Sequence, residues 1–322
     1  MTRRGTTCTA LVLALGLAAL AGCLPQQVKF CITADNRGFP GFAAIVEKIR
    51  DVPGGPGVLM ISNGDIDPPK ATHDTVVKVL GPTFGWIPVV GNHDTGYVGA
   101  ARSAASAPRY FYDYFNKNLS GKVNPGPDGC RETTFSFDVG DCHIVILNEY
   151  WNGRPESGSD TKGDGTVVAP LSEWLARDLA TSGKRWKLVF GHVPAYSQPD
   201  EDFDSSRHPD SEKTAPDRDA FWKVLEEQGV AAYVCGHTHR YSRYCPPGST
   251  VWQIDAAQAR GGSDWQYDAF VIVTVDSSSL RFDVYRNLKS RGRFAITDSL
   301  ALPEAATPTA AAKIPAAAPT AR

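Results

Sequence analysis

Residues 86–94 read Trp86-Ile87-Pro88-Val89-Val90-Gly91-Asn92-His93-Asp94, an apolar run that leads directly into a glycine and three polar residues. A continuous apolar run of this length is typical of a β-strand that is buried on both faces. The same order occurs at four more places. The polar residues that follow the apolar runs there are Asp35, Gly64-Asp65, Gly191-His192 and Gly236-His237-Thr238-His239. The chain therefore repeatedly sets a polar loop after a buried strand.

Helical patterns separate these predicted strands. The predicted helices cover residues 41–50, 71–80, 171–181 and 219–228. Strands that alternate with helices indicate an α/β layered domain, in which ligands gather at the carboxyl ends of the strands. Further alternating or apolar runs, at 133–147, 251–254, 270–275 and 280–285, predict a second, more antiparallel sheet stacked on the first.

The first 22 residues are predicted to be a lipoprotein signal peptide. Arg3 and Arg4 precede an apolar stretch at 11–21, which is shorter than the roughly 20 residues that a membrane span needs. Leu20-Ala21-Gly22-Cys23 then matches a lipobox. We expect Cys23 to carry the lipid and residues 23–27 to form a short tether, so that an exported domain faces the periplasm or the cell exterior from a membrane anchor. An ordinary signal peptide cleaved nearby is the alternative.

Residues 28–302 are expected to form one domain, followed by an Ala-, Pro- and Thr-rich tail at 303–322 that is predicted to be disordered. Removing the signal peptide removes two arginines, so 31 basic and 35 acidic residues leave a net charge of −4. These charges do not cluster by sign, and we expect no nucleic-acid partner.

Five cysteines remain in the mature chain once Cys8 has left with the signal peptide and Cys23 is lipidated. In an oxidising compartment, Cys130–Cys142 and Cys235–Cys245 are plausible disulfides, although spacing alone does not fix the connectivity.

The polar loops contain three carboxylates, those of Asp35, Asp65 and Asp94, together with the amide of Asn92 and four of the seven histidines. Taken singly, each motif has a plain explanation, because Gly-Asp is common in turns and a lone histidine after a strand is usually a hydrogen-bonded polar residue. Together, the loops supply enough donors for two adjacent metal ions. Carboxylate, imidazole and amide ligands suit Mn, Fe, Zn or Co ions.

The order Asp…Gly-Asp…Gly-Asn-His-Asp…Gly-His…Gly-His-x-His resembles the calcineurin-like metallophosphoesterase superfamily over about residues 28–302. Arg240-Tyr241-Ser242-Arg243 resembles the end of that last motif in purple-acid-phosphatase-like members. The resemblance implies a four-layer α-β-β-α sandwich of two stacked mixed β-sheets, with the metal site at the carboxyl ends of the strands. It also implies a phosphatase or phosphodiesterase that takes a small phosphoester and acts through attack of a metal-bound hydroxide.

The same resemblance implies a role for each motif residue. Asp65 would bridge two metal ions, and His93 would be the catalytic histidine whose ring Asp94 orients. The other implied ligands are Asn92, His192 and His237 for one ion, and Asp35 and His239 for the second.

One motif departs from the family pattern. The usual Asp-x-His reads Asp35-Asn36-Arg37, and a guanidinium has no lone pair for a metal ion. Water, Asp67 or His73 could fill the gap, Arg37 could grip substrate phosphate, or the site could hold a single ion. We favour a working enzyme with a weaker Asp35-side metal and Arg37 on the phosphate.

Plainer alternatives remain at this point. Arg37 could simply pair with Asp35 or Asp67. The chain as a whole could be a catalytically impaired binding protein of the cell envelope, or a structural envelope lipoprotein.

Overall fold

The computed structural model describes residues 27–95, 107–154, 165–197, 215–261, 268–287 and 293–303. The predicted signal peptide, Cys23 and nearly all of the predicted tail lie outside these residues, so those boundaries stay predictions. Within the described residues, no helix is both long enough and apolar enough to span a membrane.

The first sheet has six strands in the order β13-β12-β11-β1-β2-β3. Their bounds are β1 (Val28–Thr33), β2 (Leu59–Asn63), β3 (Gly85–Val89), β11 (Ala269–Val275), β12 (Leu280–Arg286) and β13 (Ala295–Leu302). Strands β1, β2 and β3 are parallel, whereas β11 pairs antiparallel with β1. The carboxyl ends of β1, β2 and β3 therefore meet at one edge of the sheet.

The second sheet has seven strands in the order β4-β5-β6-β7-β8-β10-β9. Their bounds are β4 (Asn124–Pro125), β5 (Phe135–Val139), β6 (Cys142–Ile146), β7 (Trp186–Phe190), β8 (Ala232–Cys235), β9 (Tyr241–Tyr244) and β10 (Trp252–Ala256). The central strands β6, β7, β8 and β10 are parallel. The loops after β7 and β8 therefore start at the same edge.

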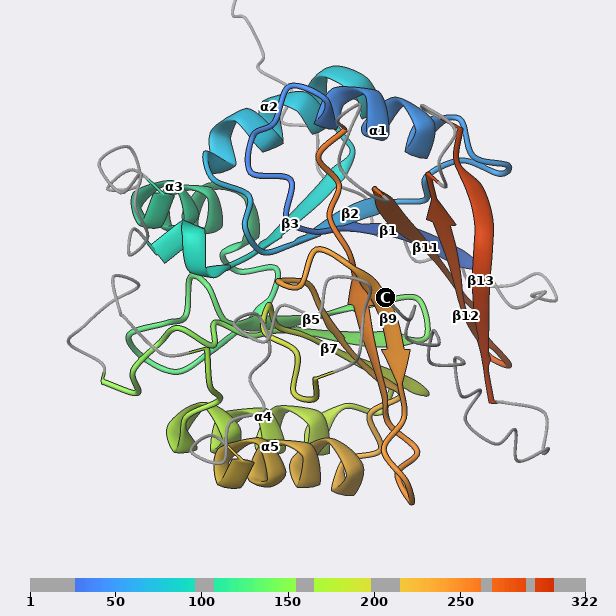
Figure 1. Ribbon diagram of the computed structural model, residues 1–322. Helices are drawn as coiled ribbons and strands as arrows, with labels where there is room; N and C mark the ends of the chain where they lie inside the picture. The colour runs from blue at the N-terminus through green and yellow to red at the C-terminus, as the bar shows by residue number, and fades with distance from the viewer. Residues whose placement is uncertain are drawn as a thin grey trace, which may run out of the picture.

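Helices cover the outer face of each sheet, which gives the predicted α-β-β-α layers (Figure 1). Helices α1 (Phe42–Arg50) and α2 (Pro69–Leu80) lie over the first sheet, and α4 (Ala169–Thr181) and α5 (Ala215–Glu227) lie over the second. Helix α3 (Ala107–Tyr114) continues into a π-helical turn, η3 (Phe115–Leu119), and η1 (Asn92–Thr95) is a short 3-10 turn after β3.

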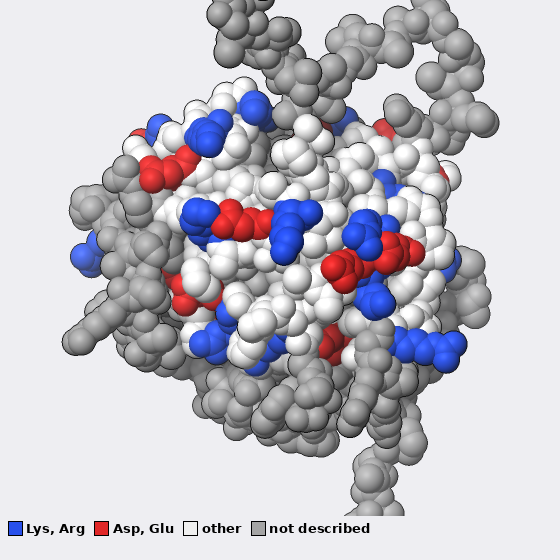
Figure 2. Space-filling view, turned by 90° about the horizontal axis from the view of Figure 1, so that it is seen from above, with Lys and Arg blue, Asp and Glu red and all other residues white. Residues whose placement is uncertain are grey.

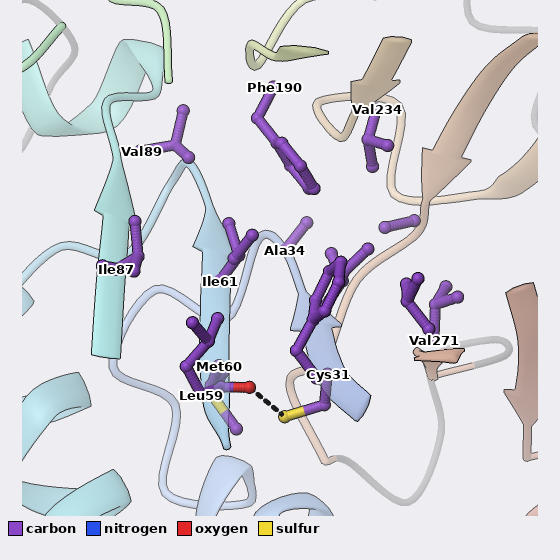
Figure 3. Close-up of a cluster of buried hydrophobic side chains, with 14 of the residues drawn as sticks. Cys31, Ala34, Leu59, Met60, Ile61, Ile87, Val89, Phe190, Val234 and Val271 are labelled. Atoms are coloured by element: carbon purple, nitrogen blue, oxygen red, sulfur yellow. Dashed lines mark hydrogen bonds between the residues drawn. The ribbon is translucent and has the colours of Figure 1, made fainter. Parts of the chain in front are cut away.

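Strand β6 shows why the central strands read as continuous apolar runs. Ile144 and Ile146 join the core between the sheets, whereas Val145 and Leu147 join the core under α4 and α5. Figure 3 shows the core between the sheets, where Phe190 of β7 points toward Ile61 of β2. Full burial of a phenylalanine contributes roughly 1.5–3 kcal/mol to folding, so this interface holds the two sheets together.

The predicted division of strands between the sheets was partly wrong. The runs at 270–275 and 280–285 form β11 and β12, which extend the first sheet, and the parallel strands β7 and β8 belong to the second. The sequence also gave no indication of α3, β9 or β13. Alternation reports which faces of a strand are buried, but it does not report which strand lies beside it.

The expected disulfides do not form, because all five described cysteines are free thiols. Cys130 packs in the core under α4 and α5, and Cys142 packs in the core between the sheets. Cys235 ends β8 and Cys245 follows β9, with β10 between those two strands. Two strand spacings are about 10 Å, well beyond the roughly 4.4–6.8 Å between the Cα atoms of a disulfide.

On the face seen from above, basic and acidic side chains lie intermixed (Figure 2).

Candidate metal centre

The predicted site residues come together where the loops after β1, β2 and β3 of the first sheet meet the loops after β7 and β8 of the second. Their backbone is unusual, because five of the six described non-glycine residues with positive φ belong to the motifs. These five are Asp35, Arg37, Asp65, His237 and His239, with φ values of 54°, 43°, 52°, 73° and 66°. Positive φ is costly for residues with a β-carbon, and such residues cluster where a site requires a particular side-chain direction.

On the Asn92 side of the site, four atoms that could bind a metal ion lie close together. His192 Nε2 lies 3.2 Å from Asn92 Oδ1 and 3.4 Å from Asp65 Oδ1. The amide oxygen of Asn92 also lies 3.0 Å from His237 Nδ1. These residues follow β2, β3, β7 and β8, so the convergence depends on both sheets.

The protonation of His192 decides what this cluster can bind. Its Nδ1 lies 3.0 Å from the carbonyl oxygen of Asn63, which can only accept, so Nδ1 donates and Nε2 carries a lone pair. Burial lowers the pKa of His192 to about 4, which keeps the ring neutral near pH 7. The Nε2 lone pair then faces two oxygen atoms that are also acceptors. A bound cation relieves this repulsion, so the cluster fits one metal ion.

On the other side of the site, Asp35 is fully buried. Its Oδ2 accepts a hydrogen bond of 2.9 Å from the backbone N–H of His237, whereas its Oδ1 has no hydrogen-bond partner among the described residues. Burial, with the charge of Asp65 next, raises the pKa of Asp35 well above its ordinary value. The donor atoms of Asp35, Asp65 and His239 lie within 4.8 Å of one another.

His239 has a second neighbour that the sequence did not reveal. Its Nε2 lies 2.8 Å from a guanidinium nitrogen of Arg260, in the loop between β10 and β11. Nothing in the local pattern around Arg260 marks it as a site residue, because the partners of its guanidinium, His239 and the carbonyl of Asp35, precede it by 21 and 225 residues.

His93 lies at the edge of the centre. Its backbone N–H donates to Asp65 Oδ1 at 2.8 Å, and its Nε2 lies 3.6 Å from Asp65 Oδ2. Burial lowers the pKa of His93, although the charge of Asp65 opposes that effect. The side chain is 18% exposed, so the ring can reach a substrate.

Asp94 does not contact the His93 ring in the way the resemblance implied. Its carboxylate accepts the backbone N–H groups of Gly91 and Ile66, at 2.8 Å and 3.1 Å, and these are its hydrogen bonds within the described residues. Asp94 therefore holds the loops after β2 and β3 together. Because Asn92–Thr95 forms the 3-10 turn η1, the chain turns back at Asp94, and the carboxylate reaches the backbone N–H of Gly91 after β3.

The guanidinium of Arg37 forms no ion pair with Asp35 or Asp67 among the residues described. The Arg37 backbone N–H donates to the carbonyl of Asp65 at 2.9 Å, which fixes the residue beside the centre. Burial raises the pKa of both Asp65 and Asp67, and the positive charge of Arg37 opposes that effect at each carboxylate.

The two residues considered as replacement ligands differ in position. His73 stacks on Trp86 and lies 2.7 Å from the hydroxyl of Tyr110, in the packing of α2 against α3 and β3. It is not one of the residues that gather with Asp35. Asp67 Oδ1 is buried and has no hydrogen-bond partner in the described part of the chain, but its carboxylate is not part of the Asp35, Asp65 and His239 group.

Glu149 is a further supporting residue that sequence analysis missed. Its buried carboxylate accepts the backbone N–H groups of His192 and Val193 and the hydroxyl of Tyr233. Burial raises the pKa of Glu149 to about 7. The carboxylate fixes the loop after β7, and thereby the backbone of His192.

Comparisons with known proteins agree with this arrangement. The family model for calcineurin-like phosphoesterases matches residues 28–241. The structure of PhoD is similar at 12% identity, with a TM-score of 0.62, over 88% of this chain and 71% of that chain. GAP50, described as the anchor in the inner membrane complex of Plasmodium, is similar at 13% identity, with a TM-score of 0.51, over 85% of this chain and 88% of that chain. These two likenesses concern the fold alone. A sequence search of curated proteins gave no match.

Proposed function

The chain belongs to the calcineurin-like phosphoesterase family, and we propose that it is an exported, lipid-anchored phosphoesterase that hydrolyses phosphomonoesters or phosphodiesters. The observation that carries the proposal is the lone pair of His192 Nε2, which faces the oxygen atoms of Asn92 and Asp65 at 3.2 Å and 3.4 Å. A cation bound between these atoms would relieve their repulsion.

When bound, a metal ion would supply Lewis-acid activation of water and positive charge for the phosphate oxygens. Asp65, Asn92, His192 and His237 would hold it. The residues around it would bind and orient the substrate. We assign His93 the role of donating a proton or a hydrogen bond to the leaving oxygen, since it is a partly exposed histidine beside Asp65 that is not among the residues that would hold the ion.

Arg37 would bind the phosphate group. It lies beside Asp65 through its backbone hydrogen bond, and its planar guanidinium matches two phosphate oxygens. The export and the lipid anchor rest on the lipobox at 20–23.

The proposal is tested with the full mature chain in detergent, freed of metal and then supplied with Mn²⁺ or Zn²⁺. We expect hydrolysis of p-nitrophenyl phosphate or bis-p-nitrophenyl phosphate that a chelator abolishes. The matched variants are His192→Ala, which removes a proposed ligand, and His73→Ala, which removes a histidine outside the centre. Hydrolysis lost in the first and kept in the second supports the proposal. Hydrolysis unchanged in His192→Ala contradicts it.

The competing function is a catalytically impaired binding protein of the cell envelope. Arg37, which replaces a histidine of the family motif, is the observation that favours it. The likeness of fold to GAP50 is compatible with either function, because fold alone does not decide activity. Metal binding without hydrolysis of any phosphoester tested would favour this function.

A further inference from the structure

The contact between Arg260 and His239 limits what His239 can bind. The Nε2 atom lies 2.8 Å from the Arg260 guanidinium, which has only donors. Nε2 must therefore be the acceptor, and the ring proton is on Nδ1. An imidazole nitrogen has one lone pair in the plane of the ring. The lone pair that a second metal ion would need is already used by Arg260.

Arg260 is held firmly in this place. Its Nε donates to the carbonyl of Asp35 at 3.0 Å, and its backbone N–H donates to Asp268 Oδ1 at 2.9 Å. The guanidinium lies over the ring of Phe39, 5.1 Å from its centroid.

The backbone next to Arg260 is equally constrained. The N–H of Ala259 donates to the carbonyl of Ala34 at 2.9 Å. Gly261 packs against Gly41 so closely that a β-carbon on either glycine would overlap the backbone of the other. With the backbone fixed, releasing His239 for a metal ion would require the guanidinium to lose its hydrogen bond to the Asp35 carbonyl and its contact with the Phe39 ring.

The Asp35 side of the site also lacks the histidine that the family motif supplies, because Arg37 stands there. With His239 engaged by Arg260, two carboxylates remain as protein ligands for a second ion. The guanidinium of Arg260, which always carries a positive charge, donates to the carbonyl of Asp35 and so lies beside this buried residue. Arg260 thus supplies positive charge beside Asp35 without a second metal.

We propose that this centre is mononuclear: one divalent ion is held by Asp65, Asn92, His192 and His237, and the guanidinium of Arg260 takes the place of the second ion beside Asp35 and His239. The inference rests on the proposed metal-dependent function and changes the expected number of ions from two to one. Asp35 then serves as the acceptor that orients the His237 backbone, rather than as a ligand.

Elemental analysis of the full mature chain tests the proposal. The protein is equilibrated with excess Zn²⁺, and free ion is removed before counting. We expect one Zn²⁺ per chain in the wild type. His237→Ala should lose it, whereas His239→Ala should retain it, because only His237 is a ligand. These two histidines lie in the same loop, so each variant controls for the other, and thermal denaturation confirms that both are folded.

Two further variants test the role of the arginines. Arg37→His alone should still bind one ion, because Arg260 continues to use the His239 lone pair. The double variant Arg37→His/Arg260→Gln should bind two. One ion in the double variant would overturn the proposal, as would two in the wild type or a loss of ion in His239→Ala. No ion in the wild type would contradict the proposed function itself, so the two failures are distinguishable.

Discussion

At the scale of a single residue, replacing His93 tests its proposed role in catalysis. His93→Ala should lower kcat by about 10²–10⁴-fold, the usual contribution of a positioned proton donor. The bound metal should remain, because the four atoms that converge on the Asn92 side do not include His93. Steady-state kinetics together with a metal count measure both effects. Full activity in the variant with metal retained would remove His93 from the mechanism.

Gly64 shows how one backbone position protects the centre. Its φ is 85°, and a β-carbon there would overlap the His192 ring. Gly81 has a φ of 100° and a ψ of 159° with nothing within 4 Å of its β-carbon position, so Gly81→Ala carries only the backbone cost of about 1–3 kcal/mol.

We expect Gly64→Ala to weaken Zn²⁺ binding by about 10–100-fold, as is usual when support for a ligand is lost. It should also lower the Tm more than Gly81→Ala does. Calorimetric titration and thermal denaturation measure the two effects. Equal behaviour of the two variants would show that the His192 ring tolerates displacement.

At the scale of secondary-structure elements, His143 joins two strands and a helix far from the metal centre. From β6, its ring lies 2.8 Å from Asp138 on β5 and 2.9 Å from Asp178 on α4. Burial lowers the pKa of His143, but the hydrogen bonds to Asp178 and Asp138 outweigh burial and raise the pKa above its ordinary value of about 6.5. The protonated ring therefore stabilises the folded state.

The sign of the pH dependence follows from the raised pKa. The stabilisation is complete below about pH 6.5 and is lost as the pH rises through the folded-state pKa. The Tm difference between the wild type and His143→Gln should be largest near pH 6 and smaller near pH 9. Thermal denaturation across this range measures it, and the comparison cancels other titrating groups. A difference that grows with pH would contradict this account.

At the scale of the whole molecule, the proposed membrane attachment depends on Cys23, which lies outside the described residues. Cys23→Ser should remove the lipid, so that the protein leaves the detergent phase in a Triton X-114 partition and enters the aqueous phase. The wild type should stay in the detergent phase. Identical partition of the two forms would show that the lipobox at 20–23 is not used.

The sequence was sufficient for the strand-and-loop units and for most of the site. Apolar runs such as 86–90 report burial on both faces, and a polar loop that follows a buried parallel strand lies at a carboxyl edge. Asp65, Asn92, His192 and His237 were identifiable for this reason, because each lies directly after its strand.

Only the tertiary structure decided how these units combine. Local alternation could not show that β11 and β12 extend the first sheet, that Asp94 binds backbone rather than the His93 ring, or that the cysteines stay apart. Arg260 reaches the carbonyl of Asp35 across 225 residues of chain. Such contacts depend on the packing of many side chains at once, and no short stretch of sequence encodes them.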